Sequence, residues 1–252
     1  MEEGTKERYS PVRQMTDAQR IRAVKEIFST VTGRYDFLNH FLSLRRDIAW
    51  RQFTVRKLRF FSTDRFLDVA TGTADLAIEA ARQHPSIHVT GLDFVQAMMN
   101  RGVIKITERG LGDRIRLLRG DALDLPFPDH CFDSVAIAFG IRNIPDKHRA
   151  LQEMKRVVVP GGQVMVLEMT FPREGVFQGF YHLYLHRILP AIARAFSKNP
   201  AAYEYLADSI ANFPSPEAFA KMMEEAGLAH VEKYSLDFGI TYLHTGVKPD
   251  AD

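Results

Sequence analysis

The sequence is poor in cysteine and in long apolar runs. A single cysteine, Cys131, stands among 252 residues, so no intrachain disulfide can form and a reducing compartment is expected. No apolar run approaches the ~20 residues of a membrane-spanning helix, and the polar start MEEGTKERYS has no signal-peptide core. We therefore expect a cytoplasmic protein, which could still make peripheral contact with the inner face of a membrane.

The chain also carries little net charge. Its 33 lysine and arginine residues nearly balance 31 aspartate and glutamate residues, which leaves a formal charge of +2. Such a charge is too small to indicate nucleic acid as a partner. With 46% hydrophobic residues the chain can build a sizeable core, and its length favours one large domain over two small ones.

Short apolar runs alternate with helical patterns through most of the chain. Strands are expected at 65–70, 88–93, 114–121, 132–140 and 163–170, and helices at 74–83, 95–110, 147–158 and 215–228. We expect Pro160-Gly161-Gly162 to be a turn before the fifth strand, and 229–239 and 240–249 to form a strand pair at the sheet edge. The alternation predicts an α/β fold with a mainly parallel sheet and helices on both faces.

Two regions depart from this alternation. Residues 1–61 are expected to form an N-terminal helical leader or lid with a break near Thr32-Gly33, and residues 62–252 the main domain. Within the main domain, residues of about 172–213 are expected to form a long, aromatic helical insert.

The stretch LDVATGTADLA, residues 67–77, has the outline of a nucleotide-binding turn after the first strand, yet Gly72 is its only glycine. Asp68 lies at the strand end, and Gly72 permits close approach of a ligand to the backbone. The helix that follows presents free N–H groups at its start. Because ligands of open α/β sheets bind beyond the carboxyl ends of the strands, this loop is the expected ligand site.

Further carboxylates follow the next two strands. Asp93 ends the second strand, where a carboxylate can accept both hydroxyls of a ribose. Asp121 and Ala122 follow the third strand, where a carboxylate with adjacent backbone can bind the edge of an adenine. These positions suit NAD and S-adenosyl-L-methionine equally.

Two features favour S-adenosylmethionine over NAD. The G-x-G-x-x-G pattern that cradles a pyrophosphate is missing. Asp68 and Asp75 flank the loop, and carboxylates repel a pyrophosphate but suit a sulfonium cation and an α-amino group. An NAD-dependent oxidoreductase is thereby disfavoured, while an α/β domain without a nucleotide, in which these aspartates only cap helices, stays open as an alternative.

Longer motifs connect the chain to a known family. The most distinctive are YDFLNHFLSLRRDIAW (35–50) and RVVVPGGQVMVLEMT (156–170), with GTAD (72–75), LPFPD (125–129), FGIRNIPD (139–146), YEYLADSI (203–210) and HTGVK (244–248). From about residue 27 to residue 248 the chain resembles the UbiE/Coq5/MenG group of quinone-biosynthesis C-methyltransferases. The resemblance implies a class I S-adenosylmethionine-dependent methyltransferase with a Rossmann-like, mainly parallel seven-stranded sheet.

The resemblance also completes the set of expected site residues. Eight residues are expected to bind the cofactor: Asp68, Ala70, Gly72, Thr73, Asp93, Asp121, Ala122 and Ala138. Arg142 and Asn143 are the implied catalytic pair; Arg142 would stabilise negative charge and polarise a water that accepts the proton. Tyr35, Asn39 and His244 are the expected substrate-binding residues, with helix packing and a buried core position as the open alternatives. No metal site is expected.

The implied reaction is methylation of a ring carbon of a demethylmenaquinol-like polyprenyl quinol. Three alternatives stay open: the 2-methoxy-6-polyprenyl-1,4-benzoquinol of ubiquinone biosynthesis, another electron-rich small molecule, and non-catalytic binding of quinone or S-adenosylmethionine. Asp47 stands where the family usually has histidine, which bears on the choice of substrate.

Two segments suggest how a lipid-borne substrate is reached. Residues 176–196 are aromatic and aliphatic yet contain His182, His186, Arg187 and Arg194, a mixture that fits an apolar tunnel, a membrane interface, or core and homodimer packing. Residues 45–59 carry six basic side chains against one acid, which fits attraction to anionic lipid or an ordinary solvated helix face.

Overall fold

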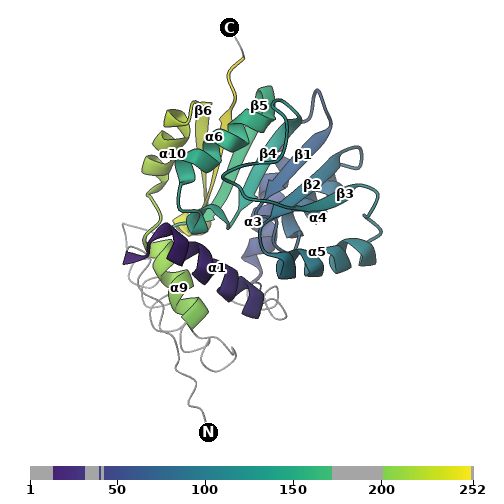
Figure 1. Cartoon of the computed structure of the whole chain (residues 1–252). Coiled ribbons are helices and arrows are strands. Elements are labelled where there is room, and N and C mark those ends of the chain that lie inside the picture. The colour runs from purple at the N-terminus through teal and green to yellow at the C-terminus, as the bar shows by residue number, and fades with distance from the viewer. Residues whose placement is uncertain (1–13, 32–39, 41–42, 172–200, 251–252) are drawn as a thin grey trace.

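The computed structural model describes residues 14–31, 40, 43–171 and 201–250 (Figure 1). In this part of the chain one sheet is formed by β1 (Arg65–Val69), β2 (His88–Asp93), β3 (Ile115–Arg119), β4 (Phe132–Ala138), β5 (Val158–Met169), β6 (Ala229–Leu236) and β7 (Thr241–Val247). The strand order is β3-β2-β1-β4-β5-β7-β6. Strands β1 to β5 pair in parallel, whereas β7 is antiparallel to both of its neighbours. The predicted sheet and the strand pair at its edge are confirmed.

Helices fill the connections. The described ones are α1 (Asp17–Val31), α3 (Arg46–Arg56), α4 (Asp75–Gln83), α5 (Gln96–Glu108), α6 (Lys147–Val157), α9 (Ala201–Ala211) and α10 (Pro216–Glu225), with the 3-10 turns η3 (Ile141–Asn143) and η5 (Asp237–Gly239). Polar side chains start two of them, because Asp146 accepts the Arg149 N–H and Ser215 accepts the Ala218 N–H. The helix expected at 215–228 therefore begins after a capping Ser215.

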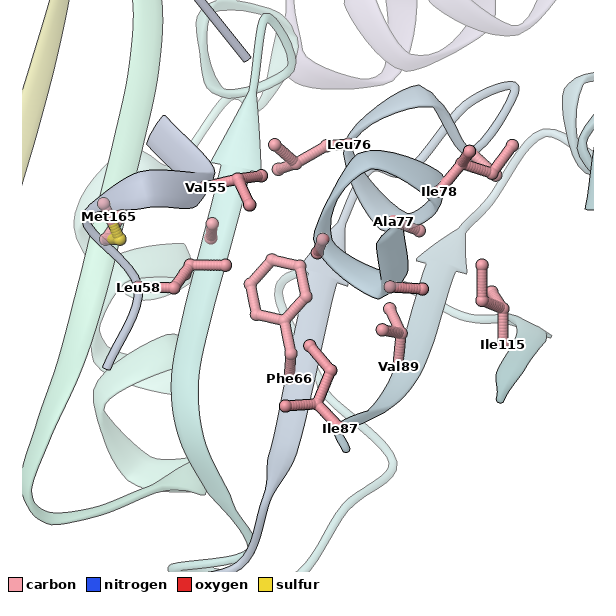
Figure 2. Close-up of a cluster of buried hydrophobic side chains, with 14 of the residues drawn as sticks. Val55, Leu58, Phe66, Leu76, Ala77, Ile78, Ile87, Val89, Ile115 and Met165 are labelled. Atoms are coloured by element: carbon pink, nitrogen blue, oxygen red, sulfur yellow. The ribbon is translucent and has the colours of Figure 1, made fainter. Parts of the chain in front are cut away.

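Both faces of the sheet are covered by helices. In β1, Phe66 points to one face and packs with side chains of α3 and α4 (Figure 2). Leu67 and Val69 point to the other face and pack with α6 and α10. All three side chains have no exposed surface. Covering on both faces is what a parallel sheet requires, and it leaves the strand ends as the place for a ligand.

Helices from distant parts of the chain meet at the carboxyl ends of the strands. Val24 and Ile27 of α1 pack with Tyr205 and Ile210 of α9, and Met169 at the end of β5 packs against them. Figure 1 shows the two helices side by side below the sheet. The predicted boundary between an N-terminal lid and the main domain at residue 61 stays a prediction. Within residues 1–61, however, α1 covers the strand ends, whereas α3 packs against one face of the sheet.

One expectation about the fifth strand is wrong. Pro160-Gly161-Gly162 does not form a separate turn but lies within β5. The pairing with β4 shifts register there, and Gly161 takes a left-handed conformation at φ 71°. Its N–H still bonds to the Lys248 carbonyl at 2.9 Å. An irregular, glycine-containing segment therefore carries the strand past the turn residues while keeping this hydrogen bond to the chain after β7.

A buried carboxylate fastens the segment before β1. Asp133, at the start of β4, has no exposed surface and accepts the backbone N–H groups of four consecutive residues, Phe61 to Asp64, at 2.8–3.3 Å. Replacing Asp133 with alanine leaves these donors without a partner, so we expect the free energy of unfolding to fall by about 3 kcal/mol. Urea denaturation followed by circular dichroism measures this loss.

The matched control is Asp113→Ala, because Asp113 is an exposed acid before β3. Its replacement should change the free energy of unfolding by less than about 0.5 kcal/mol. Equal stability of the two variants would contradict an anchoring role for Asp133. Since Asp133 lies at the amino ends of the strands, ligand binding by the folded variant should stay normal.

Candidate active site

A cavity of about 580 Å³ opens at the carboxyl edge of the sheet. Its volume lies within the range of small-molecule sites, which is about 300–1,000 Å³. All eight residues predicted to bind the cofactor and both predicted catalytic residues line it: Asp68, Ala70, Gly72, Thr73, Asp93, Asp121, Ala122, Ala138, Arg142 and Asn143. The structure thus brings together at one site residues that the sequence places after four different strands.

The loop after β1 owes its shape to alanine as well as glycine. Ala70, Gly72 and Ala74 all take left-handed conformations, with φ of 53°, 55° and 66°. Left-handed backbone favours glycine but is accessible to alanine at a cost of about 1–2 kcal/mol. The loop therefore turns sharply beneath the cavity although Gly72 is its only glycine.

Asp93 holds this loop against β2. Its Oδ2 accepts the Gly72 N–H at 2.8 Å, and its Oδ1 accepts the Val95 N–H at 2.8 Å. Burial raises the pKa of the Asp93 carboxyl, although these backbone bonds oppose the shift. A carboxylate has about four acceptor positions. Asp93 can therefore position the loop and still accept the two hydroxyls of a ribose.

Asp68 is the most deeply buried acid of the cavity. Only 1% of its surface is exposed, and Oδ2 accepts the Thr71 hydroxyl at 2.6 Å and the Ala77 N–H at 3.1 Å. Burial raises its pKa to about 7, and the two hydrogen bonds limit the rise. The Asp68 carboxyl is therefore about half protonated near pH 7, and a nearby cation would favour its ionised form. The positively charged end of S-adenosylmethionine is a cation of this kind.

The burial of Asp68 should make the stability of the ligand-free protein depend on pH. Because the folded pKa of Asp68 lies above its ordinary value of 3.8, the folded state binds more protons than the unfolded state between about pH 4 and 7. This group therefore lowers stability as pH rises through that window. We expect Asp68→Asn to be more stable than wild type at pH 8, by on the order of 2 kcal/mol, and the difference to shrink toward pH 5.

Urea denaturation at pH 5, 6, 7 and 8 measures the difference between the two proteins. A constant difference across this range would mean that Asp68 does not titrate there.

The second acid that flanks the loop has a different environment. Asp75 also lines the cavity, but it forms an ion pair with Lys105. The Lys105 ammonium also donates to the Thr73 hydroxyl at 3.1 Å. The charge of Asp75 is therefore compensated within the protein, whereas Asp68 has no ion pair of this kind among the described residues.

Arg142 is held by an acid that the sequence analysis did not single out. One guanidinium nitrogen, NH1, lies 2.5 Å from Glu168 Oε1 and donates to the Phe139 carbonyl at 2.8 Å. The second carboxylate oxygen of Glu168 accepts the Arg142 backbone N–H at 3.2 Å. Glu168 is fully buried near the end of β5. Its place beside the other strand-end carboxylates is the sequence signal that would have identified it.

Glu168 is expected to act through Arg142. The change Glu168→Gln keeps the shape but removes the charge that orients the guanidinium, so turnover should fall by about 10- to 100-fold with little change in cofactor affinity. Steady-state kinetics and calorimetry separate these effects. The control is Glu153→Gln, since Glu153 is also buried and pairs with an arginine, Arg156, but does not line the cavity. A loss of turnover in both variants alike would argue against a positioning role.

Asn143 connects the strand end with the helical cover. Its Oδ1 accepts the Tyr205 hydroxyl of α9 at 3.2 Å. Tyr205 is only 6% exposed, and burial raises its pKa. The Asn143 side chain is therefore oriented from α9, an element far away in the sequence.

Asp47 belongs to a charged cluster on the wall of the cavity. It accepts the Ser43 hydroxyl at 2.7 Å and Arg51 NH1 at 2.6 Å, and the His40 ring nitrogen Nδ1 lies 2.8 Å from it. Burial alone raises the pKa of Asp47, but Arg51 and the hydrogen bonds of Ser43 and Arg51 together hold it below its usual value. Asp47 is thus an ionised, fully partnered carboxylate.

Of the three expected substrate-binding residues, only His244 lies within the described residues. His244 is fully buried in β7, its Nε2 lies 2.9 Å from the Pro216 carbonyl, and its ring packs on Phe219. His244 is not among the cavity-lining residues. It occupies the buried core position that the sequence analysis gives as the alternative. Tyr35 and Asn39 lie outside the described residues, and so does the segment 176–196, so the predictions of a tunnel and of a homodimer stay predictions. Within the described chain, no helix has the length and hydropathy needed to cross a bilayer.

Fold and site together define a class of enzyme. The doubly wound sheet with an antiparallel β7, and a carboxylate at the end of β2 that holds a loop without the pyrophosphate pattern, are those of a class I S-adenosylmethionine-dependent methyltransferase. An S-adenosylmethionine-dependent methyltransferase of Thermotoga maritima has the same fold, with a TM-score of 0.62 at 20% identity, over 88% of this chain and 98% of that one.

The particular family follows from the sequence as a whole. The model of the ubiE/COQ5 methyltransferase family matches residues 14–248, and the chain belongs to this family. A ubiquinone/menaquinone biosynthesis C-methyltransferase of Geotalea daltonii is 43% identical over 89% of this chain and 96% of its own length. A demethylmenaquinone methyltransferase of Thermus thermophilus is 43% identical over 88% of this chain and 100% of its own length.

Proposed function

We propose that the chain transfers a methyl group from S-adenosylmethionine to a ring carbon of a demethylmenaquinol-like polyprenyl quinol. The observation that carries the proposal is the buried Arg142–Glu168 ion pair, because Arg142 lines a cavity that has both a polar and an apolar wall. The polar wall contains Asp68 and Asp93. The names of the relatives from Geotalea daltonii and Thermus thermophilus support a quinol as the acceptor.

The apolar wall suits an aromatic acceptor with a long hydrocarbon tail. It is built by α1 and α9 together with the loop after β2 and the end of β5, and its members are Ile21, Val24, Phe28, Phe94, Met169, Leu206 and Ile210. Side chains of this kind bind rings and prenyl units by burial of apolar surface. A hydroquinol ring seated against this wall would place its hydroxyls toward Arg142 and Asn143.

The residues of the site meet the demands of C-methylation. When bound, S-adenosylmethionine supplies an electrophilic methyl group. A new carbon–carbon bond forms as the carbon–sulfur bond breaks, and the same ring carbon then loses its proton. Arg142 stabilises the negative charge on a ring oxygen. It remains protonated itself and polarises a water that accepts the proton, while Asn143 orients that water or the hydroxyl.

Methyl transfer from radiolabelled S-adenosylmethionine tests the proposal. Demethylmenaquinol and 2-methoxy-6-polyprenyl-1,4-benzoquinol are offered separately in detergent under reducing conditions. Label in the naphthoquinol ring supports the proposed substrate, and label in the benzoquinol ring alone assigns the alternative. If neither quinol is labelled while the protein still binds S-adenosylmethionine, the proposed acceptor is wrong, and the Asp47 cluster is the first place to examine.

A further inference from the structure

Two apolar side chains stand out on the surface. Among the described residues, six large hydrophobic side chains are exposed, and the two most exposed are Leu44 at 82% and Phe238 at 85%. The next is Phe61, at 57%. Single exposed apolar residues are ordinary on protein surfaces. Leu44 and Phe238, however, share a backbone conformation and a location.

Each of the two side chains lies in a pair of left-handed residues. Leu44 and Arg45 have φ of 51° and 63°, and Asp237 and Phe238 have φ of 46° and 56°. Left-handed backbone is unfavourable for leucine and phenylalanine, and it persists only where the surrounding contacts impose it. Both loops therefore present a bulky apolar residue at the tip of a tight turn.

An ion pair fastens the two loops to each other. Arg46 Nε donates to Asp237 Oδ2 at 2.6 Å, and a second guanidinium nitrogen contacts Oδ1. The Trp50 ring N–H donates to the same carboxylate at 2.7 Å. Arg46 follows Leu44 by two residues, and Asp237 directly precedes Phe238. The loops of Leu44 and Phe238 are consequently joined into one structural unit, residues 44–46 with residues 237–238.

This unit stands at the rim of the cavity. Ser43, which precedes Leu44, lines the cavity, and so does Trp50. On the other side, the Gly239 carbonyl next to Phe238 accepts the Thr170 hydroxyl at 2.7 Å, directly after the cavity-lining Met169. Both tips therefore lie near the apolar wall at which the proposed function places the acceptor.

The charges around the tips identify a partner. Of the six basic residues in 45–59, Arg51 pairs with Asp47, Arg56 and Lys57 lie over aromatic rings, and Arg59 follows α3 with its backbone bonded to Ser134 of β4. Arg45 and Arg46 remain beside the two tips, with Asp237 as the one acid bonded there among the described residues. Two separate side chains on turns are too small for a stable protein interface, which needs about 800 Å² on each partner. Apolar tips next to arginines instead suit a bilayer with anionic headgroups.

We propose that Leu44 and Phe238 insert into the interfacial layer of an anionic phospholipid bilayer, with Arg45 and Arg46 at the headgroups. The inference rests on the proposed function, because a polyprenyl quinol is dissolved in the membrane and must enter the cavity from it. Docking by these two tips turns the apolar wall of the cavity toward the lipid. The surface is then the route by which the acceptor reaches the site.

Vesicle sedimentation tests the surface directly. The probe is vesicles of phosphatidylcholine with about one-third phosphatidylglycerol, and the proteins are wild type, Leu44→Ser/Phe238→Ser and the matched control Phe61→Ser. We expect the double variant to bind vesicles at least about tenfold more weakly than wild type, and the control to bind like wild type. Equal binding of wild type and double variant, or no binding of wild type, would overturn the proposal. So would a double variant that differs from wild type in oligomeric state by analytical ultracentrifugation, since a second copy would then be the partner.

An activity measurement separates the failure of this inference from the failure of the proposed function. Demethylmenaquinol with a short, water-compatible side chain is compared with the long-chain quinol carried in the same vesicles. The double variant should keep wild-type activity on the short quinol and lose most of its activity on the vesicle-borne one. Loss of both activities would place the two residues in the folding or the chemistry of the enzyme and overturn the inference. If wild type binds vesicles through these tips but methylates neither quinol, the surface stands and the proposed substrate is wrong.

Discussion

Replacing Arg142 with alanine is expected to lower the turnover of quinol methylation by about 100- to 1,000-fold while the affinity for S-adenosylmethionine changes by less than about twofold. The loss has this size because one charged donor aimed at developing negative charge in a buried site contributes about 3–4 kcal/mol to the transition state. Arg142 is 7% exposed and its guanidinium is fixed by Glu168 and the Phe139 carbonyl, so the guanidinium needs no reorganisation during the reaction. Single-turnover kinetics with radiolabelled cofactor measure the chemical step.

The matched control is Arg101→Ala, which removes an exposed arginine of α5 that does not line the cavity. This variant should keep the wild-type rate. The Arg142 variant can also have a lowered melting temperature. Both rates are therefore measured well below the unfolding transition, where the variant stays folded. If the Arg142 variant turns over within threefold of wild type, the positive charge does not act on the reacting ring, and another group must stabilise the developing negative charge.

The cofactor side of the site could be predicted because it depends on local sequence. Asp68, Asp93 and Asp121 each follow a short apolar run, and the carboxyl ends of parallel strands meet at one edge by topology alone. The structure accordingly places all three on one cavity. The positive φ of Ala70 and Ala74 was not predictable in the same way, because alanine gives no signal for left-handed backbone.

The acceptor side was harder to predict, because it is built by tertiary contacts. Its wall combines α1 with α9, and no sequence period indicates that these helices pack together. Tyr205 reaches Asn143 only in the folded protein, and Glu168 has no marker beyond its place near the end of a strand. The same holds for Asp133, whose four backbone partners precede it by about 70 residues. Fully buried polar residues of this kind look like ordinary strand residues in the sequence.

Removing the Asp93 carboxylate is expected to have the largest effect on cofactor binding. In Asp93→Ala the ribose loses its acceptor and the Gly72 and Val95 N–H groups lose theirs, so the affinity for S-adenosylmethionine should fall by about 100-fold or more. Asp93→Asn should bind S-adenosylmethionine nearly as weakly. Its amide has one acceptor oxygen, whereas the Gly72 and Val95 N–H groups bond to two separate oxygens of the carboxylate. Isothermal titration calorimetry gives the affinities, and quenching of Trp50, the one tryptophan of the chain and a member of the cavity wall, gives an independent value. Asp124→Ala, an exposed change after β3, is the control.

The roles of Asp68 and Asp93 should be distinguishable by the charge of the ligand. S-adenosylmethionine and its demethylated product S-adenosylhomocysteine share the ribose and the α-amino group, and only the first carries a sulfonium charge. Loss of the Asp93 carboxylate removes ribose contacts, so it should weaken both ligands by the same factor. In Asp68→Asn the buried carboxylate that suits a cation is gone, so S-adenosylmethionine should lose more affinity than the product does. Equal losses in the Asp68 variant would mean that this acid either acts on the α-amino group, which both ligands share, or only fixes the loop through Thr71 and Ala77. The attraction to the sulfonium would then have to come from another group.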